Sequence, residues 1–353
     1  MEIIIPDLPN DVARECLIRV SYNQFSTISA ACKAWKDQIQ LPQFLAQRKA
    51  ARFAQKIIVM VQSRVDPNKK RGPKCFASPV YGLTLLHPDT GHCSELPTFS
   101  DHGLPLFCQL TTVGSELVVM GGLDPVTWEA SNSIFVYNFV LARWRRGVDM
   151  PGVRRSFFGC ASDLDRTVYV AGGHDDEKNA LRSAVAYDVA RDEWIRLPDM
   201  AKERDECKAV FHGGKFHVIG GYCTEMQGRF ERSAEVFDVE TRRWDPIQED
   251  FLGATTCPRT IVGGDDVELY MCHGGDVLAS RDTKWQAVAK LPAEVCNTAY
   301  VTTWQGKMLV IGSARFGEPH LAYVLDLKSY TWTKLDTTEK FSGHVQSGCY
   351  LEI

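Results

Sequence analysis

Histidine and cysteine are the residues of this 353-residue chain whose side chains could bind a metal or attack a substrate. His212 and His217 stand five positions apart across a Gly-Gly pair, which places them on different strands or at a turn and not as a ready metal pair. The twelve cysteines form no CxxC motif, and most lie in apolar strings where a free thiol packs as a small hydrophobe. No GxGxxG, GxxxxGK[ST] or HExxH motif occurs. The sequence therefore predicts no catalytic site, no metal and no cofactor.

Arginine offers a different chemistry, which is recognition of another protein. Its guanidinium group donates hydrogen bonds in a fixed fork and is readily desolvated. We expect Arg154 and Arg204 to be structurally equivalent, because each follows a tryptophan by ten positions. Some of these arginines could instead only bridge neighbouring repeats, and this alternative stays open. The candidate contact residues for a protein ligand are Arg154, Arg155, His174, Arg204, Arg229, Phe230, Arg232, Arg259 and Arg315.

The elements that must position these residues repeat along the chain. Trp144, Trp194 and Trp244 are 50 residues apart and end the strings YNFVLARW, YDVARDEW and FDVETRRW. A β-rich run ending in Gly-Gly precedes each tryptophan by about 22 residues. A fixed period near 50 indicates a radial or stacked repeat architecture.

The same seven-residue register fits three further segments, 86–93, 278–285 and 325–332, with Cys93 in one tryptophan position. Each string has the pattern of a β-hairpin, and two strand-like runs precede it. Six units of four short strands predict an all-β, six-bladed propeller over residues 57–353. The first unit lacks one strand, and we expect residues 344–353 to supply it and close the ring.

The double glycine followed by Tyr or Phe and then Trp resembles the kelch repeat, most specifically in the second to fourth copies. Residues 1–46 differ: their spacing predicts three short helices, one beginning at Asn10 or Asp11, one over about 26–39, and one from Pro42 to about Gln55. Residues 47–56 are predicted to be a linker helix. So small a helical unit is marginal alone and suggests a partner.

The strings LPNDVARECLIRV and AACKAWK in this segment resemble an F-box, a small all-α domain. The resemblance implies binding to a Skp-type adaptor of a cullin-RING ubiquitin ligase, with Leu8 and Pro9 at the centre of the contact. A plain three-helix cap on the propeller is the alternative. The residues that match the motif are Leu8, Pro9, Val12, Ala13, Leu17, Val20 and Trp35.

An F-box followed by kelch repeats is similar to a plant arrangement, and several strings resemble the KISS ME DEADLY group, among them GLPLFCQL, MPGVRRSFFGCASD and GHVQSGCYLEI. That resemblance implies a non-catalytic substrate receptor of a Skp–cullin–F-box (SCF) ligase. Its implied targets are phenylalanine ammonia-lyase, in phenylpropanoid synthesis, and type-B response regulators, in cytokinin signalling. A scaffold that sequesters its partner without ubiquitination is the alternative, and a propeller oxidase that uses copper is a more distant one.

The net charge of −4 gives no electrostatic reason to expect nucleic-acid or membrane binding. No apolar stretch approaches the roughly 20 residues of a membrane span, and the N-terminus lacks the pattern of a signal peptide. We therefore expect a cytoplasmic or nuclear protein with reduced thiols. The one basic run, within 69–74, is either a nuclear signal or a solvated loop.

Overall fold

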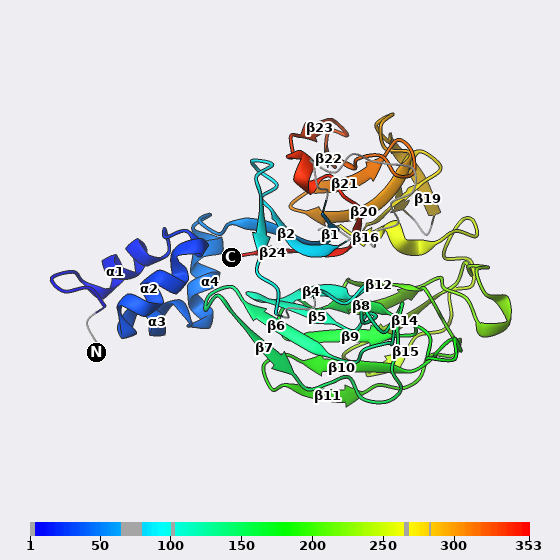
Figure 1. Ribbon diagram of the computed structural model, residues 1–353, viewed down its shortest axis with the longest axis horizontal. Coiled ribbons are helices and arrows are strands. Elements are labelled where there is room, and N and C mark those ends of the chain that lie inside the picture. The colour runs from blue at the N-terminus through cyan, green and yellow to red at the C-terminus, as the bar shows by residue number, and fades with distance from the viewer. Residues whose placement is uncertain (1–3, 65–79, 100–102, 265–267, 282–283) are drawn as a thin grey trace.

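Six four-stranded antiparallel sheets follow four helices along the chain (Figure 1). The computed structural model describes residues 4–64, 80–99, 103–264, 268–281 and 284–353, so the basic run at 69–74 lies outside the described residues. Within these ranges, no helix is long and apolar enough to cross a membrane. The six-bladed propeller predicted from the repeat is confirmed.

The sheets are numbered as blades 1 to 6, each given from its inner to its outer strand. Blades 1 to 3 are β24 (Val345–Glu352), β1 (Lys56–Ser63), β2 (Tyr81–Leu86), β3 (Cys93–Leu96); β4 (Gln109–Val113), β5 (Glu116–Met120), β6 (Ile134–Asn138), β7 (Arg143–Gly147); and β8 (Gly159–Ser162), β9 (Thr167–Ala171), β10 (Ala184–Asp188), β11 (Glu193–Arg196). Blades 4 to 6 are β12 (Lys208–His212), β13 (Lys215–Ile219), β14 (Ala234–Asp238), β15 (Arg243–Trp244); β16 (Ile261–Gly263), β17 (Leu269–His273), β18 (Asp276–Arg281), β19 (Lys284–Lys290); and β20 (Asn297–Trp304), β21 (Lys307–Ser313), β22 (Leu321–Asp326), β23 (Trp332–Leu335).

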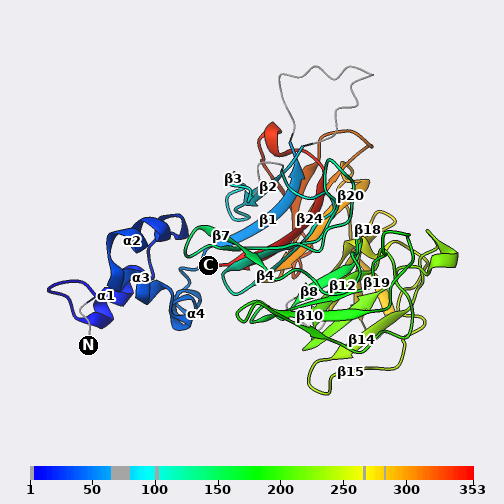
Figure 2. The same cartoon turned by 60° about the horizontal axis from the view of Figure 1, so that its bottom comes forward.

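The inner strands contact one another in a closed circle, in the order β4, β8, β12, β16, β20 and β24. The last strand of the chain, β24, is the inner strand of blade 1 and lies beside β1 (Figure 2). Its register runs from Lys56 opposite Glu352 to Gln62 opposite Val345. Blade 1 is thus built from both ends of the propeller sequence, and β24 supplies the inner strand that the start of the propeller lacks.

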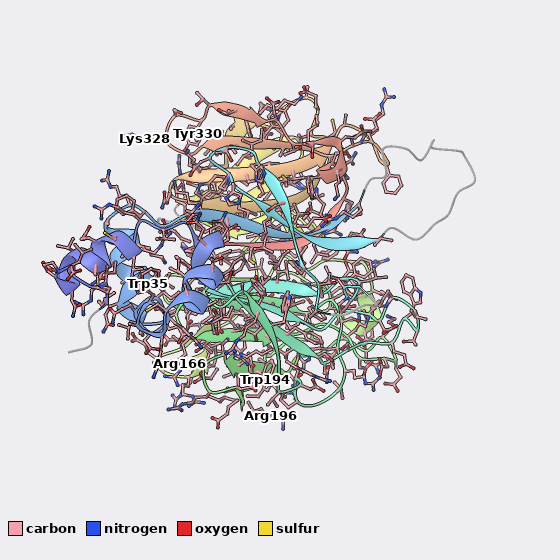
Figure 3. The ribbon with its side chains drawn as sticks, turned by 60° about the vertical axis from the view of Figure 1, so that its left-hand side comes forward. Trp35, Arg166, Trp194, Arg196, Lys328 and Tyr330 are labelled. Atoms are coloured by element: carbon pink, nitrogen blue, oxygen red, sulfur yellow. The ribbon has the colours of Figure 1, made fainter. Side chains whose placement is uncertain are left out.

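Tryptophan side chains connect successive blades. The indole Nε1 of Trp144 donates to Pro97 O at 2.8 Å, and that of Trp194 donates to Val148 O at 2.8 Å (Figure 3 labels Trp194). In four cases the acceptor carbonyl lies at the end of the outer strand of the preceding blade or within two residues of it, and in the fifth it lies in the longer segment that follows β15. The same bond is made by Trp244 to Pro198 O, Trp285 to Phe251 O and Trp332 to Lys290 O.

The hairpin register of blade 5 differs from the prediction. In the other blades the two ends of the repeat string pair directly, as Tyr187 does with Trp194 and Leu86 with Cys93. In blade 5 Trp285 pairs with Ser280, and Leu278 pairs with Ala287, so the connection is tighter than the seven-residue register requires. A tryptophan at the right place along the chain therefore did not fix the strand pairing.

The helical segment consists of α1 (Asn10–Leu17), α2 (Phe25–Ala31), α3 (Lys33–Ile39) and α4 (Pro42–Ala50). The single helix expected over 26–39 is wrong, because Cys32 adopts an extended conformation that separates α2 from α3. The linker helix expected over 47–56 is also wrong in extent. Helix α4 ends at Ala50, and Arg52 then takes a positive φ of 61° while the Phe53 N–H bonds back to Arg48 O.

The side chain of Arg48 joins the helices to the propeller, and only 1% of it is exposed. Its guanidinium donates to Ile18 O at 2.6 Å, to Val20 O, and to Ile353 O at 3.3 Å, and it stacks over the Phe25 ring. Burial lowers the pKa of Arg48 to about 10. One hydrophobic cluster also spans both parts, so the helices and blades 1 and 2 share a core.

We expect closure by β24 to stabilise the whole ring. Val345 is fully buried, and Val345→Asp places a charge in that interior, so the free energy of unfolding should fall by more than about 3 kcal/mol. Ile195→Asp, on an exposed outer strand, is the matched control and should change it little. Chemical denaturation measures both. Equal stability of the two variants would contradict a role for β24 in holding the ring.

Candidate functional site

Two sets of loops meet at one end of the propeller. One set leads from each outer strand to the inner strand of the next blade, and the other follows the double glycines. Isolated β-bridges join them within a blade: Leu106 with Leu123, Ser156 with His174, and Asp205 with Tyr222. We call this end the loop face. All nine arginine, histidine and phenylalanine residues proposed for recognition lie on it.

The double glycines make these bridges possible. Gly173 has a φ of 82°, and a Cβ there would lie 2.4 Å from Ser156 O. Gly221 has a φ of 81°, and a Cβ would lie 2.7 Å from Asp205 O. Only a residue without a side chain lets the incoming loop pass so close to the strand end.

Two of the candidate arginines are structural. The Arg155 guanidinium donates to Gly172 O, Ser183 O and Ser183 Oγ, and 2% of the residue is exposed. Arg204 makes the same set of bonds one blade further on, to Gly220 O, Ser233 O and Ser233 Oγ. Arg204 also forms a buried ion pair with Glu235, with Nε 3.1 Å from Oε1. Both side chains fix the post-glycine loop of their own blade.

The predicted equivalence of Arg154 and Arg204 is therefore wrong by one residue, and Arg155 is the partner of Arg204. Met150 and Met200 both follow their tryptophan by six positions, and both bond to the chain before the third strand. From Met150 to Arg155 there are five steps, and from Met200 to Arg204 there are four. The extra residue lies in the turn at Gly152, whose φ is 90°.

His174 is also buried, and it belongs to a chain of three side chains. Its Nε2 lies 2.8 Å from Ser156 Oγ, and its Nδ1 lies 2.8 Å from an Asp205 carboxylate oxygen. Ser-His-Asp triads of hydrolases have this order of contacts. Here the exposed fractions of the three residues are 2%, 6% and 3%, so a substrate cannot reach the hydroxyl. The chain links blade 3 to blade 4, and His174 is a structural residue here and not a contact residue as proposed.

The other candidates are accessible. Arg232 is paired with Asp250, and the Phe230 ring packs edge-on against Tyr222. Arg154 lies 3.6 Å from Glu129 in an exposed pair that contributes little to stability. Exposed apolar side chains at loop tips accompany them, which is typical of protein-binding surfaces. The exposed arginines are Arg154, Arg229, Arg232, Arg259 and Arg315, and the exposed apolar residues are Val80, Val126, Trp128, Val153, Met226 and Phe316.

A second candidate surface lies on the helices, far along the chain from the loop face. Leu8, Pro9 and Val12 are exposed at the start of α1, where a turn at Asp7 with φ 65° presents them. Ala13 and Leu17, one turn along, are buried in the shared core. Leu8, Pro9 and Val12 therefore form an exposed apolar surface at the start of α1, which we call the α1 edge, and the opposite face of the helix belongs to the core.

Val20 and Trp35 lie between these two groups. The Trp35 indole Nε1 donates to Ile4 O at 2.7 Å and so ties the N-terminal segment to α3 (Figure 3). Val20 is partly buried, and its carbonyl accepts from Arg48. We assign Ala13, Leu17, Val20 and Trp35 to the integrity of the helical unit, and only Leu8, Pro9 and Val12 offer free contact area.

Metal-binding groups do not gather in the described part of the chain, where no cluster of three or more His, Cys, Asp or Glu side chains is positioned to hold an ion. His212 ends β12 and His217 is the third residue of β13, where its Nε2 lies 3.2 Å from His212 O. The two histidines therefore do not form a cluster that could hold an ion.

Two family models match this chain, one over the helices that carry the α1 edge and one over the propeller. The model of the F-box domain matches residues 5–47, and that of the kelch motif matches 106–151, 154–201 and 203–249. The F-box/kelch-repeat protein At1g80440 of Arabidopsis thaliana is 53% identical to this chain, and the match covers 99% of both. The chain belongs to the F-box/kelch-repeat family.

Other relatives support the same assignment. F-box/kelch-repeat protein At1g15670 of Arabidopsis thaliana is 52% identical, with 99% of both chains covered, and At2g44130 is 35% identical over 74% of this chain and 69% of that protein. The solved structure of YjhT shares the fold, with a TM-score of 0.57 at 13% identity over 72% of this chain and 91% of that chain. F-box/kelch-repeat proteins generally act as substrate receptors of SCF ligases and not as catalysts. The F-box domain implies a Skp1-type adaptor and a cullin as partners.

The buried position of Arg204 predicts a large cost for its loss. Arg204→Met leaves the Glu235 carboxylate buried without its partner, and the free energy of unfolding should fall by about 3 to 5 kcal/mol. Arg154→Met is the matched control, because the same change at an exposed position should cost no more than about 0.5 kcal/mol. Urea denaturation followed by tryptophan fluorescence measures both. A similar loss in the two variants would show that burial is not the cause.

Proposed function

We propose that this protein recruits phenylalanine ammonia-lyase, type-B response regulators, or both to an SCF ubiquitin ligase. The loop face would hold the target and the α1 edge would hold the adaptor. The target assignment rests on the resemblance of several strings to the KISS ME DEADLY group, and its consequences would be lower phenylpropanoid synthesis and weaker cytokinin signalling.

The observation that supports a receptor best is the separation of two exposed surfaces on one rigid body. Leu8, Pro9 and Val12 lie on the helices, and the exposed arginines lie on the loop face. Arg48 and the shared core hold the two parts at a fixed distance. A receptor needs no reactive group of its own, because it accelerates transfer by raising the local concentration of target lysines near the loaded conjugating enzyme.

The adaptor edge can be tested without disturbing the core. Replacing Leu8 and Pro9 with Ala removes exposed apolar area, so adaptor pull-down should be lost while the melting temperature stays the same. Leu164→Ala, an exposed leucine on a propeller loop, should leave the pull-down unchanged. If adaptor binding is lost but the half-life of the bound target is not lengthened, the protein is a sequestering scaffold and not a ligase receptor.

The target assignment needs a separate measurement. We expect the full-length protein to capture phenylalanine ammonia-lyase or a type-B response regulator, and Arg229→Ala with Phe230→Ala to reduce the captured amount at least about tenfold. Both side chains lie in a post-glycine loop, away from the buried arginines. Quantitative pull-down of each candidate tests this. Capture of neither protein would remove the resemblance as a guide to the target.

The cellular location of the protein is a further part of this proposal. We propose that the protein works in the cytoplasm, the nucleus or both, since these compartments keep cysteines reduced and all cysteines in the described ranges are free. The basic run at 69–74 remains a candidate nuclear signal.

A further inference from the structure

The axis of the propeller contains a cavity that neither the family nor the proposed target explains. Its volume is about 400 Å³, and its walls are the inner strands and the loops that enter them. The lining extends from Phe157, before β8, to Leu164, beyond the end of that strand, so the cavity follows the channel along the axis. Cavities of this size accommodate small ligands or a few side chains.

One side of the channel mouth is aromatic. Phe107 and Phe157 precede the inner strands β4 and β8, and their ring centroids lie 5.0 Å apart. Their φ angles are 58° and 55°, in the left-handed region that bulky residues rarely adopt. Glu206, at the same place before β12, has a φ of 49°. Backbone strain repeated at three equivalent positions is typical of sites where side chains must face a ligand.

The other side of the mouth carries positive charge. Lys208 begins β12, Arg259 precedes β16, and both line the cavity. Among the described residues, no carboxylate forms an ion pair with either. Burial lowers the pKa of Lys208, Cys160 raises it and the neighbouring Arg259 lowers it. A carboxylate bound beside Lys208 and Arg259 would therefore favour the charged form of Lys208.

The acidic residues of the lining are occupied elsewhere. Glu206 accepts a hydrogen bond from Tyr222 Oη at 3.0 Å, on the loop face. Asp163 lies beyond the far end of β8, where its carboxylate accepts three backbone N–H groups. His344 also borders the mouth, and burial, His320 and Arg259 lower its pKa to about 4, so it is neutral at pH 7.

We propose that the channel mouth binds a carboxylate carried next to an aromatic or branched apolar group. Lys208 and Arg259 hold the carboxylate by charge-assisted hydrogen bonds, and Phe107 and Phe157 contact the apolar group. The ligand is either a free small carboxylic acid or an acidic side chain of the recruited protein. Only the second source rests on the proposed function.

Calorimetric titration of the full-length protein with 3-phenylpropanoate tests the first source. We expect it to bind at least about tenfold more tightly than 3-phenylpropanamide, which has the same shape without the charge. Lys208→Met and Arg259→Met should each reduce the affinity for the acid by about tenfold and leave that for the amide unchanged. Arg196→Met, on the outer strand β11 (Figure 3), is the matched control and should bind like the wild type.

The peptide acetyl-Glu-Phe-Glu-amide, compared with acetyl-Gln-Phe-Gln-amide, tests the second source in the same way. Binding of the free acid alone assigns the site to a small ligand, and binding of the acidic peptide alone assigns it to the recruited protein. Melting temperatures show whether each variant is folded. The proposal is overturned if neither probe is preferred over its uncharged partner, or if Lys208→Met and Arg259→Met bind the charged probes as well as the wild type. Adaptor pull-down is independent of this result, so failure here leaves the receptor function standing.

Discussion

The hydrogen bond from a tryptophan indole to the backbone of the preceding blade is the contact on which this propeller depends. Trp144, Trp194, Trp244, Trp285 and Trp332 each make it, to a carbonyl in the outer strand of the preceding blade or in the segment that follows that strand. It places a large apolar ring between two sheets and satisfies its one polar group there. Because each blade is anchored to the one before it, the angle between blades is repeated until the ring closes.

The sixth junction, between blade 6 and blade 1, has no such bond, and other contacts close the ring there. Cys93 occupies the tryptophan position of blade 1, its thiol lies 3.6 Å from Gly91 O of its own hairpin, and it packs against a cluster that includes residues of blade 6. A Cβ on Gly91 would lie 3.2 Å from Asp336 O, which follows the outer strand of blade 6, so the backbones themselves approach closely. The covalent start and end of the propeller meet in this blade, through the pairing of β24 with β1. At the junction without a tryptophan bond, the ring is thus closed by backbone pairing and by apolar packing.

Buried arginines also donate hydrogen bonds to backbone carbonyls, in the loops and in the helical segment. Arg155 and Arg204 each donate to the carbonyl of the first glycine of a pair and to the carbonyl of a serine before the third strand, and Arg48 donates to carbonyls of the helical segment and of Ile353. Each guanidinium thus gives several donors to the backbone of two segments at once. The loops of blades 3 and 4 are therefore anchored at their base, and Arg48 anchors the helices to the end of β24. This anchoring suits a receptor, whose contribution is the placement of one protein beside another.

Residue spacing alone determined much of this protein. Three copies of Trp and Gly-Gly at a period of 50 predicted the repeat, and extension of the seven-residue hairpin register to segments 86–93, 278–285 and 325–332 gave six blades. The LPND string and its resemblance to an F-box predicted a contact centred on Leu8 and Pro9. These features are local or periodic, so each can be recognised without knowing what lies opposite it in space.

The division of the site into structural and accessible residues was decided only by tertiary structure. Arg155, His174 and Arg204 have the composition of a recognition loop, yet all three are buried against residues 16 to 31 positions away. A single extra residue near Gly152 moved the structural arginine from the predicted position to the next one. Phe107, Phe157 and Lys208 come together around the axis from three blades, and their strings gave no local signal of this. Burial and convergence depend on which segments the closed ring brings together. A periodic sequence indicates the ring, but it does not show which side chains become neighbours within it.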